Sequence, residues 1–134
     1  MILGVDPGER RVGLAVADTE TRFARPLEVI DQVTTDAVVR IEEVIQELGV
    51  TLVVVGRPVA LSGIEGPAVE KQKTFLVRLR AALDVDVEVF DERLTTVLAE
   101  RSMQAGGASA KKRKEMRDAV AAQVMLQGYM DVQR

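Results

Sequence analysis

Acidic residues lie at three places in the chain where chemistry is commonly sited. Asp6 closes a short apolar run before a Pro-Gly turn, and Asp91 with Glu92 closes another apolar run. Asp118 adjoins apolar residues in the C-terminal segment. Strand ends form the usual ligand edge of an α/β sheet, and carboxylates prefer hard cations such as Mg²⁺ or Mn²⁺. If the last helix packs over the sheet, these acids converge on a divalent-metal site.

Each acid also has an ordinary structural interpretation. Asp6 can be a turn residue, and Asp91-Glu92 can place negative charge at a helix N-terminus. Asp118 can be a solvated helix residue paired with Lys114 one turn earlier. The residue types alone leave both interpretations open.

The composition restricts the chemistry further. The 134 residues include no Cys and no His, which excludes thiolate nucleophiles, Cys-based zinc sites and histidine general bases. With no Trp, one Tyr and three Phe, base stacking is not expected to dominate binding. The net charge of -3 provides no overall positive field, so nucleic-acid binding would need a local basic patch.

A basic run provides such a patch beside Asp118. Its alternative interpretation is a solvated helix face, but phosphate contacts there would supply affinity without sequence specificity. The run consists of Lys111, Lys112, Arg113, Lys114 and Arg117. Four more cations are predicted to extend it: Arg10, Arg11, Arg57 and Arg93.

The hydrophobic pattern predicts the elements that position these residues. Strands are predicted at 1–6, 11–18, 23–30, 50–55 and 85–90. Helices are predicted at 35–48, 67–83, 94–105 and 112–131. The order β-β-β-α-β-α-β-α-α indicates one α/β domain over residues 1–134, with helices on the faces of a mixed five-stranded sheet.

Several single residues refine these elements. Gly13 lies inside a predicted strand, which indicates either close approach of another backbone or ligand, or an ordinary hairpin. Pro26 favours an edge or bulge position in the third strand. Thr35 or Asp36 is expected to cap the first helix, and Gly49 to end it.

The first residues, MILGVDPGERR, lack the basic start and long apolar run of a signal peptide. No apolar stretch is long enough to span a membrane. We therefore expect a cytoplasmic protein without membrane partners.

Four stretches stand in this order in the chain: Leu3–Gly8 continuing through Arg11–Val16 to Asp18; Val54–Pro58 with Gly63 and Gly66; Asp91–Thr96; and Lys114 with Asp118-Ala119 and Ala121-Ala122. Together they resemble the YqgF/RuvX family, a bacterial group related to Holliday junction resolvases. The glycine-aspartate hairpin is shared with ATPases of the actin and sugar-kinase class, whereas the stretch DERLTT is more specific. Arg57 departs from the family, which more often has an apolar residue there.

The resemblance implies an RNase H-like, RuvC-like fold and a metal-dependent phosphodiesterase. By position, Asp6, Glu92 and Asp118 match the family's catalytic and metal-binding acids, with Asp91 as a possible substitute for Glu92. In a two-metal mechanism, Asp6 would bridge two Mg²⁺ or Mn²⁺ ions about 3.5–4 Å apart.

The resemblance implies processing of the 5′ end of pre-16S rRNA during ribosome biogenesis, with the ribosomal particle as a possible partner. The alternative is resolution of four-way DNA junctions in recombination and repair, which would need a homodimer, whereas RNA trimming is compatible with a monomer. A non-catalytic nucleic-acid-binding module is a further alternative. A two-lobed ATPase is disfavoured because 134 residues leave no room for a second lobe.

Overall fold

The computed structural model describes residues 1–57, 67–91 and 110–132, with side chains described for 1–57, 70–90 and 116–132. The predicted helix 94–105 lies outside these residues. The strands are β1 (Ile2–Pro7), β2 (Arg11–Ala17), β3 (Ala24–Asp31), β4 (Leu52–Arg57) and β5 (Asp86–Asp91). The helices are α1 (Ala37–Leu48), α2 (Pro67–Ala82) and α4 (Ala110–Val132).

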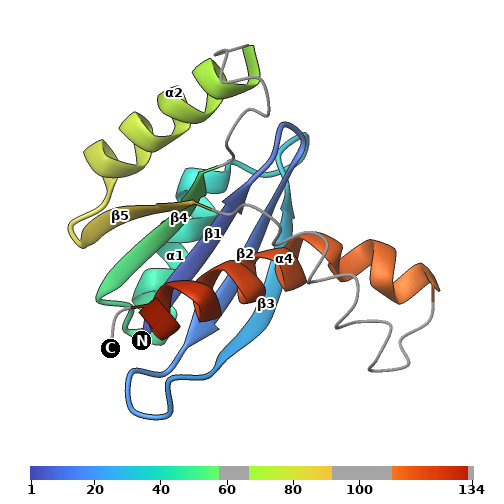
Figure 1. The fold of residues 1–134 in the computed structure, drawn as a ribbon. Helices are drawn as coiled ribbons and strands as arrows, with labels where there is room; N and C mark the ends of the chain where they lie inside the picture. Colours follow the sequence, from blue (N-terminus) through green and yellow to red (C-terminus); the bar gives the residue numbers. More distant parts are fainter. Residues whose placement is uncertain (58–66, 92–109, 133–134) are drawn as a thin grey trace.

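The five strands form one mixed sheet in the order β3-β2-β1-β4-β5 (Figure 1). β2 pairs antiparallel with β1 and with β3, whereas β4 pairs parallel with β1 and with β5. The predicted mixed α/β sheet is therefore confirmed. Because β1, β4 and β5 run in the same direction, their carboxyl ends meet at one edge of the sheet.

Alternation along the strands divides the core between the two faces of the sheet. Leu3 and Val5 of β1 belong to a cluster with Ile41 of α1 and with Phe75 and Leu79 of α2. The opposite face packs against α4, which crosses the sheet in Figure 1. Successive strand side chains point to opposite faces, so each strand residue belongs either to the α1–α2 side or to the α4 side.

The fourth strand begins and ends two residues later than its hydrophobic run predicted. The N–H of Val50 donates to the carbonyl of Ile45 at 3.1 Å, so Val50 still belongs to the end of α1. β4 instead continues through Gly56 and Arg57, beyond the predicted end of the strand at residue 55. Three consecutive buried residues, Val53–Val55, agree with the prediction of a strand buried on both faces.

The third strand is an edge strand, as Pro26 indicated. Its pairing with β2 shifts between Leu14 and Ala15, so Pro26 also lies beside a bulge. Proline is tolerated there because a bulged edge requires fewer backbone donors. In the part of the chain that the structure describes, no helix has the length and apolar character needed to cross a bilayer.

Asp36 caps α1 and is the first testable position. Its carboxylate accepts hydrogen bonds from the N–H of Val38 and Val39, and Gly49 ends the helix at φ 66°. We expect Asp36→Ala to lower the free energy of unfolding by about 1 kcal/mol and Asp36→Asn to lower it less, since Asn also caps well. Urea denaturation at neutral pH measures both, and equal stability of the alanine variant and the wild type would refute this role.

The same residue predicts a pH dependence. Slight burial raises the pKa of Asp36, but hydrogen bonds from Val39 and Val38 and the nearby Arg78 guanidinium outweigh it, so the pKa lies below the ordinary 3.8. A lowered pKa in the folded state stabilises the fold above the ordinary pKa and loses that effect as the pH falls through the lowered value. The stability gap between the wild type and Asp36→Ala should therefore narrow below about pH 4.

Candidate active site

Asp6 lies near the carboxyl end of β1, on the face that α4 covers. Its strand partner on β2 is Gly13, and directly opposed residues of an antiparallel pair share a face. Ile2 and Gly4, at the same alternation of β1, both lie against α4: Ile2 packs in its cluster, and Gly4 faces Leu126. The half-buried Asp6 side chain therefore extends this row at its open end.

Asp118 is brought to the same place by a backbone contact. A Cβ built on Gly13 would overlap the carbonyl oxygen of Asp118 and lie 2.9 Å from the nitrogen of Ala119. The α4 backbone at Asp118 thus rests directly on the strand partner of Asp6. Of the two interpretations of Gly13, the structure shows the close approach of another backbone. This contact brings two of the three predicted acids to one side of the sheet.

The C-terminal half of α4 is fastened to both sides of the sheet. On the β5 side, the Tyr129 hydroxyl donates to the Glu88 carboxylate, and its ring meets Phe90 edge-on with centroids 5.8 Å apart. On the β3 side, Gln127 Oε1 accepts from the N–H of Ala24 at 2.9 Å. Burial and the adjacent Glu88 raise the pKa of Tyr129 to about 12, so the hydroxyl stays a donor at neutral pH. These contacts fix the helix that carries Asp118.

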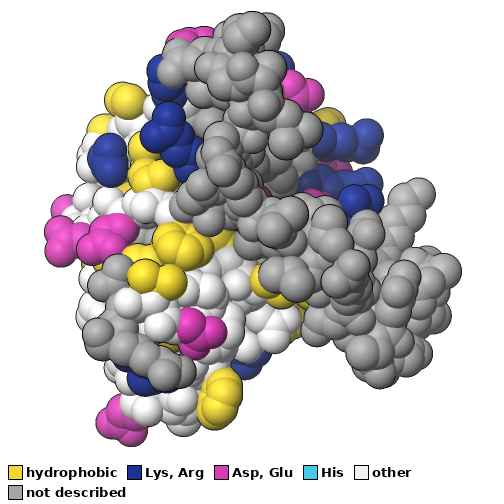
Figure 2. Space-filling model, in the orientation of Figure 1, with side chains coloured by type: hydrophobic (Ala, Val, Ile, Leu, Met, Phe, Trp, Pro, Cys, Tyr) yellow, Lys and Arg dark blue, Asp and Glu magenta, His cyan; other side chains and the backbone are white. Residues whose placement is uncertain are grey.

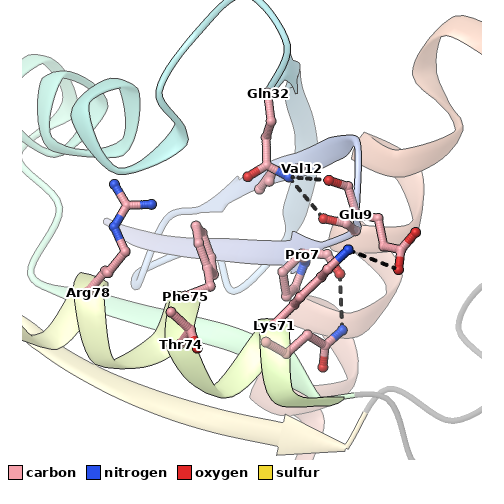
Figure 3. A pocket seen from close by; sticks show the side chains of 10 residues that line it. Pro7, Glu9, Val12, Gln32, Lys71, Thr74, Phe75 and Arg78 are labelled. Carbon is pink, nitrogen blue, oxygen red and sulfur yellow. Dashed lines mark hydrogen bonds and ion pairs between the residues drawn. The ribbon is translucent and has the colours of Figure 1, made fainter. Parts of the chain in front are cut away.

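The β1–β2 hairpin that carries Asp6 is held from the opposite side (Figure 3). Gln32 Nε2 donates to the carbonyl of Gly8 at 2.9 Å, and Gln72 Nε2 of α2 donates to the carbonyl of Pro7 at 3.3 Å. Because these donors bind backbone oxygens, they constrain the turn that follows Asp6. Both proposed ligands therefore lie on elements held by several independent contacts.

The third predicted acid is not placed. Asp91 is the last residue of β5, its side chain is outside the described residues, and so is Glu92. The described residues contain no group of three or more metal-ligating side chains. Asp6 and Asp118 nevertheless place carboxylates from two elements on one side of the sheet, and carboxylate oxygens are ligands that Mg²⁺ and Mn²⁺ prefer.

The predicted basic patch is divided between the two faces. Arg11 begins β2 two residues before Gly13 and so belongs to the α4 side, where exposed Arg117 also lies beside Asp118. Arg57 instead lines a cavity on the α2 side, because β4 extends farther than predicted. Arg10 is exposed in the hairpin, and its Nε lies 3.9 Å from Asp31 Oδ1. The remaining predicted cations, whose side chains are outside the described residues, are Arg93, Lys111, Lys112, Arg113 and Lys114.

The hydrophobic pattern did not reveal a second basic surface, on α2. Residues 70–82 contain one acid, Glu70, and four cations. Lys and Arg side chains gather over α2 in Figure 2. The charge count of this helix is the signal in the sequence that indicates the basic surface, whereas the apolar period indicates only the buried face. The four cations are Lys71, Lys73, Arg78 and Arg80.

Comparison with known proteins identifies a family and individual relatives that the chain resembles in sequence. The family model described as "RuvX: Holliday junction resolvase" matches residues 1–132. A Chloroflexus aggregans protein described as "Putative pre-16S rRNA nuclease" is 43% identical over 134 residues, covering 99% of this chain and 94% of its own. An Anaeromyxobacter dehalogenans (strain 2CP-1) protein with the same description is 45% identical over 130 residues, covering 96% and 95%.

Solved structures share the fold. RuvC of T. thermophilus, in complex with a Holliday junction substrate, has a TM-score of 0.65 and 20% identity, covering 98% of this chain and 94% of its own. The fowlpox virus resolvase, in complex with Holliday junction DNA, has a TM-score of 0.60 and 12% identity, covering 98% and 97%. The fold is therefore the RuvC-like form of the RNase H fold, as the sequence resemblance implied.

Proposed function

Because the chain belongs to the RuvX family, we propose that it is a cytoplasmic, single-domain nuclease that hydrolyses phosphodiester bonds of structured nucleic acid with the help of divalent cations. The observation that carries this proposal is the seating of the Asp118 backbone on Gly13, the strand partner of Asp6. That contact joins two acids, distant in the sequence, on one side of the sheet.

Asp6, Glu92 and Asp118 are the proposed catalytic residues and would hold Mg²⁺ or Mn²⁺. β5 ends at Asp91. By its position in the family's motif, Glu92 is the proposed third acid, with Asp91 as its possible substitute. Two such cations, when bound, would lower the pKa of water and neutralise phosphoryl charge, which suits a chain without His. The carboxylates of the chain would hold these cations.

The cations on the α4 side would bind the nucleic-acid backbone beside the acids. Arg11 and Arg117 are exposed there, and the basic run 111–114 precedes Arg117 in the sequence. Backbone contacts of this kind hold the substrate in register without reading its sequence. The positive charges of these side chains compensate locally for the net charge of -3.

The substrate that we propose is pre-16S rRNA, cut at its 5′ end in ribosome biogenesis, with the ribosomal particle as a partner. The description of relatives 43% and 45% identical over nearly their whole length supports this choice. The description of the family model favours a second candidate, the Holliday junction. A junction-cutting enzyme should be a dimer, so that two strands are cut symmetrically.

Metal binding tests the site itself. By isothermal titration calorimetry with Mn²⁺, we expect Asp118→Asn to bind at least about tenfold more weakly than the wild type, because an amide removes the charge that attracts the cation. Asp131→Asn is the matched control, since Asp131 is exposed on the same helix and accepts only from Gln127 among the described residues. Equal Mn²⁺ affinity of the wild type and Asp118→Asn would show that Asp118 is not a metal ligand.

A further inference from the structure

A second groove lies between α2 and the carboxyl ends of β1 and β4, on the face opposite α4. Its volume is about 280 Å³, close to the lower limit for small-molecule sites of about 300 Å³. Its apolar lining comes from Pro7, Val55, Leu76 and Val89, and its cations are Arg57, Lys73 and Arg80.

Two of the three cations of this groove, Arg57 and Arg80, have no acidic partner among the described residues. None of the described lining residues is acidic. Arg57 has no hydrogen-bond or ion-pair partner among the described residues, and Arg80 donates to a neutral carbonyl, that of Val87, at 3.4 Å. Lys73 is already paired, with its Nζ 3.8 Å from Glu70 Oε1, so the two arginines carry the argument. The groove is therefore suited to an anion.

The groove opens at the same edge of the sheet as the acids. Arg57 is the last residue of β4, and Pro7, the last residue of β1, directly follows Asp6. A nucleic-acid strand bound at Asp6 on the α4 side reaches the α2 side by crossing the ends of β1 and β4. The position of the groove therefore fits a flanking part of the same substrate.

We propose that this groove binds one unpaired nucleotide of the substrate, which rests on the nuclease function proposed above. Arg57 and Arg80 bind its phosphate, since guanidinium groups match phosphate oxygens in pairs. The sugar and base lie on the apolar lining, where Val89 is 36% exposed. A base within a duplex is stacked and paired, so the groove selects substrates with a single-stranded segment next to the cleavage site.

Binding without metal tests this proposal separately from cleavage. Fluorescence anisotropy in EDTA measures the affinity of the protein for a labelled single-stranded oligoribonucleotide. The affinity for the matching duplex is the comparison. We expect Arg57→Gln/Arg80→Gln to weaken single-strand binding about tenfold or more and to lower the salt slope by about 1 for each contact removed. Arg25→Gln, an exposed arginine of β3 outside the groove, should match the wild type. Unchanged affinity of the double variant, verified as folded by thermal unfolding, overturns the proposal.

The apolar lining has its own test. Val89→Ser should weaken single-strand binding without changing the salt slope, whereas Val77→Ser, 67% exposed on α2 and outside the groove, should have no effect. Competition with uridine monophosphate and with inorganic phosphate completes the test. If inorganic phosphate competes as well as the nucleotide, or if Val89→Ser binds normally, the groove is only a cationic patch and the nucleotide site is refuted.

The two proposals fail separately. Loss of binding in Arg57→Gln/Arg80→Gln with no cleavage by the wild type supports the groove and contradicts the nuclease. Cleavage that depends on Asp6, with normal binding by the groove variants, supports the nuclease and contradicts the groove.

Discussion

Asp6→Asn is expected to abolish metal-dependent cleavage, with a loss of about a thousandfold or more, while the fold is retained. The amide keeps the size of the side chain but removes the charge that would hold a divalent cation. The backbone pairing of β1 with β2 does not use this side chain, so the ladder is kept. Cleavage of a labelled substrate with Mn²⁺ measures the first effect, and thermal unfolding measures the second.

Asp18→Asn is the matched control for this change. Asp18 is exposed, follows the end of β2 away from the hairpin, and accepts a hydrogen bond from the N–H of Glu20 that an asparagine oxygen also accepts. We expect wild-type cleavage from this variant. Full cleavage by Asp6→Asn would refute the proposed mechanism, and equal loss in both variants would show an effect of the substitution that is not specific to the site.

Gly13→Ala is expected to damage stability and cleavage together. The new methyl group would overlap the carbonyl oxygen of Asp118, which is backbone and cannot rotate away as a side chain can. α4 must therefore move off the sheet, which carries Asp118 away from Asp6. Overpacking of this kind costs about 1–3 kcal/mol, and we expect at least that loss in urea denaturation. Isothermal titration calorimetry, at a temperature at which Gly13→Ala is still folded, should show weaker Mn²⁺ binding than in the wild type.

Gly128→Ala, on the same helix, is the control for Gly13→Ala. A Cβ at Gly128 would lie 3.6 Å from Phe90 Cε2, an ordinary contact distance. Because alanine is the better helix former, this variant should be about 0.5–1 kcal/mol more stable than the wild type. If Gly13→Ala were as stable and as active as Gly128→Ala, the close contact of α4 with β2 would not position the site.

The local elements of the fold were predictable because their signals are local. The apolar period defined α1, Asp36 and Gly49 marked its ends, and Pro26 indicated the edge strand. The order of the strands was not predictable from periodicity, because it depends on contacts between distant segments. Gly13 was an exception, since a strand glycine signals close approach, although it did not reveal that the approaching segment was α4.

The position of Arg57 shows the limit of the same reasoning at the site. Hydrophobicity ended the fourth strand at residue 55, but backbone pairing with β5 continues through Gly56 and Arg57. Since side chains alternate, the extension determines which face Arg57 joins, and it joins the α2 side. The sequence grouped it with cations on the α4 side because a list of charges contains no information about faces.

The most direct test of the central claim is cleavage of two labelled substrates in parallel, with Mg²⁺ or Mn²⁺, by the wild type and by Asp6→Asn. One substrate is a pre-16S rRNA fragment with its 5′ leader, and the other is a four-way DNA junction. We predict that the wild type cuts the RNA near the mature 5′ end more efficiently than the junction, and that Asp6→Asn cuts neither. Cleavage of both substrates by Asp6→Asn at the wild-type rate, or no cleavage by the wild type even with ribosomal particles present, would contradict the claim.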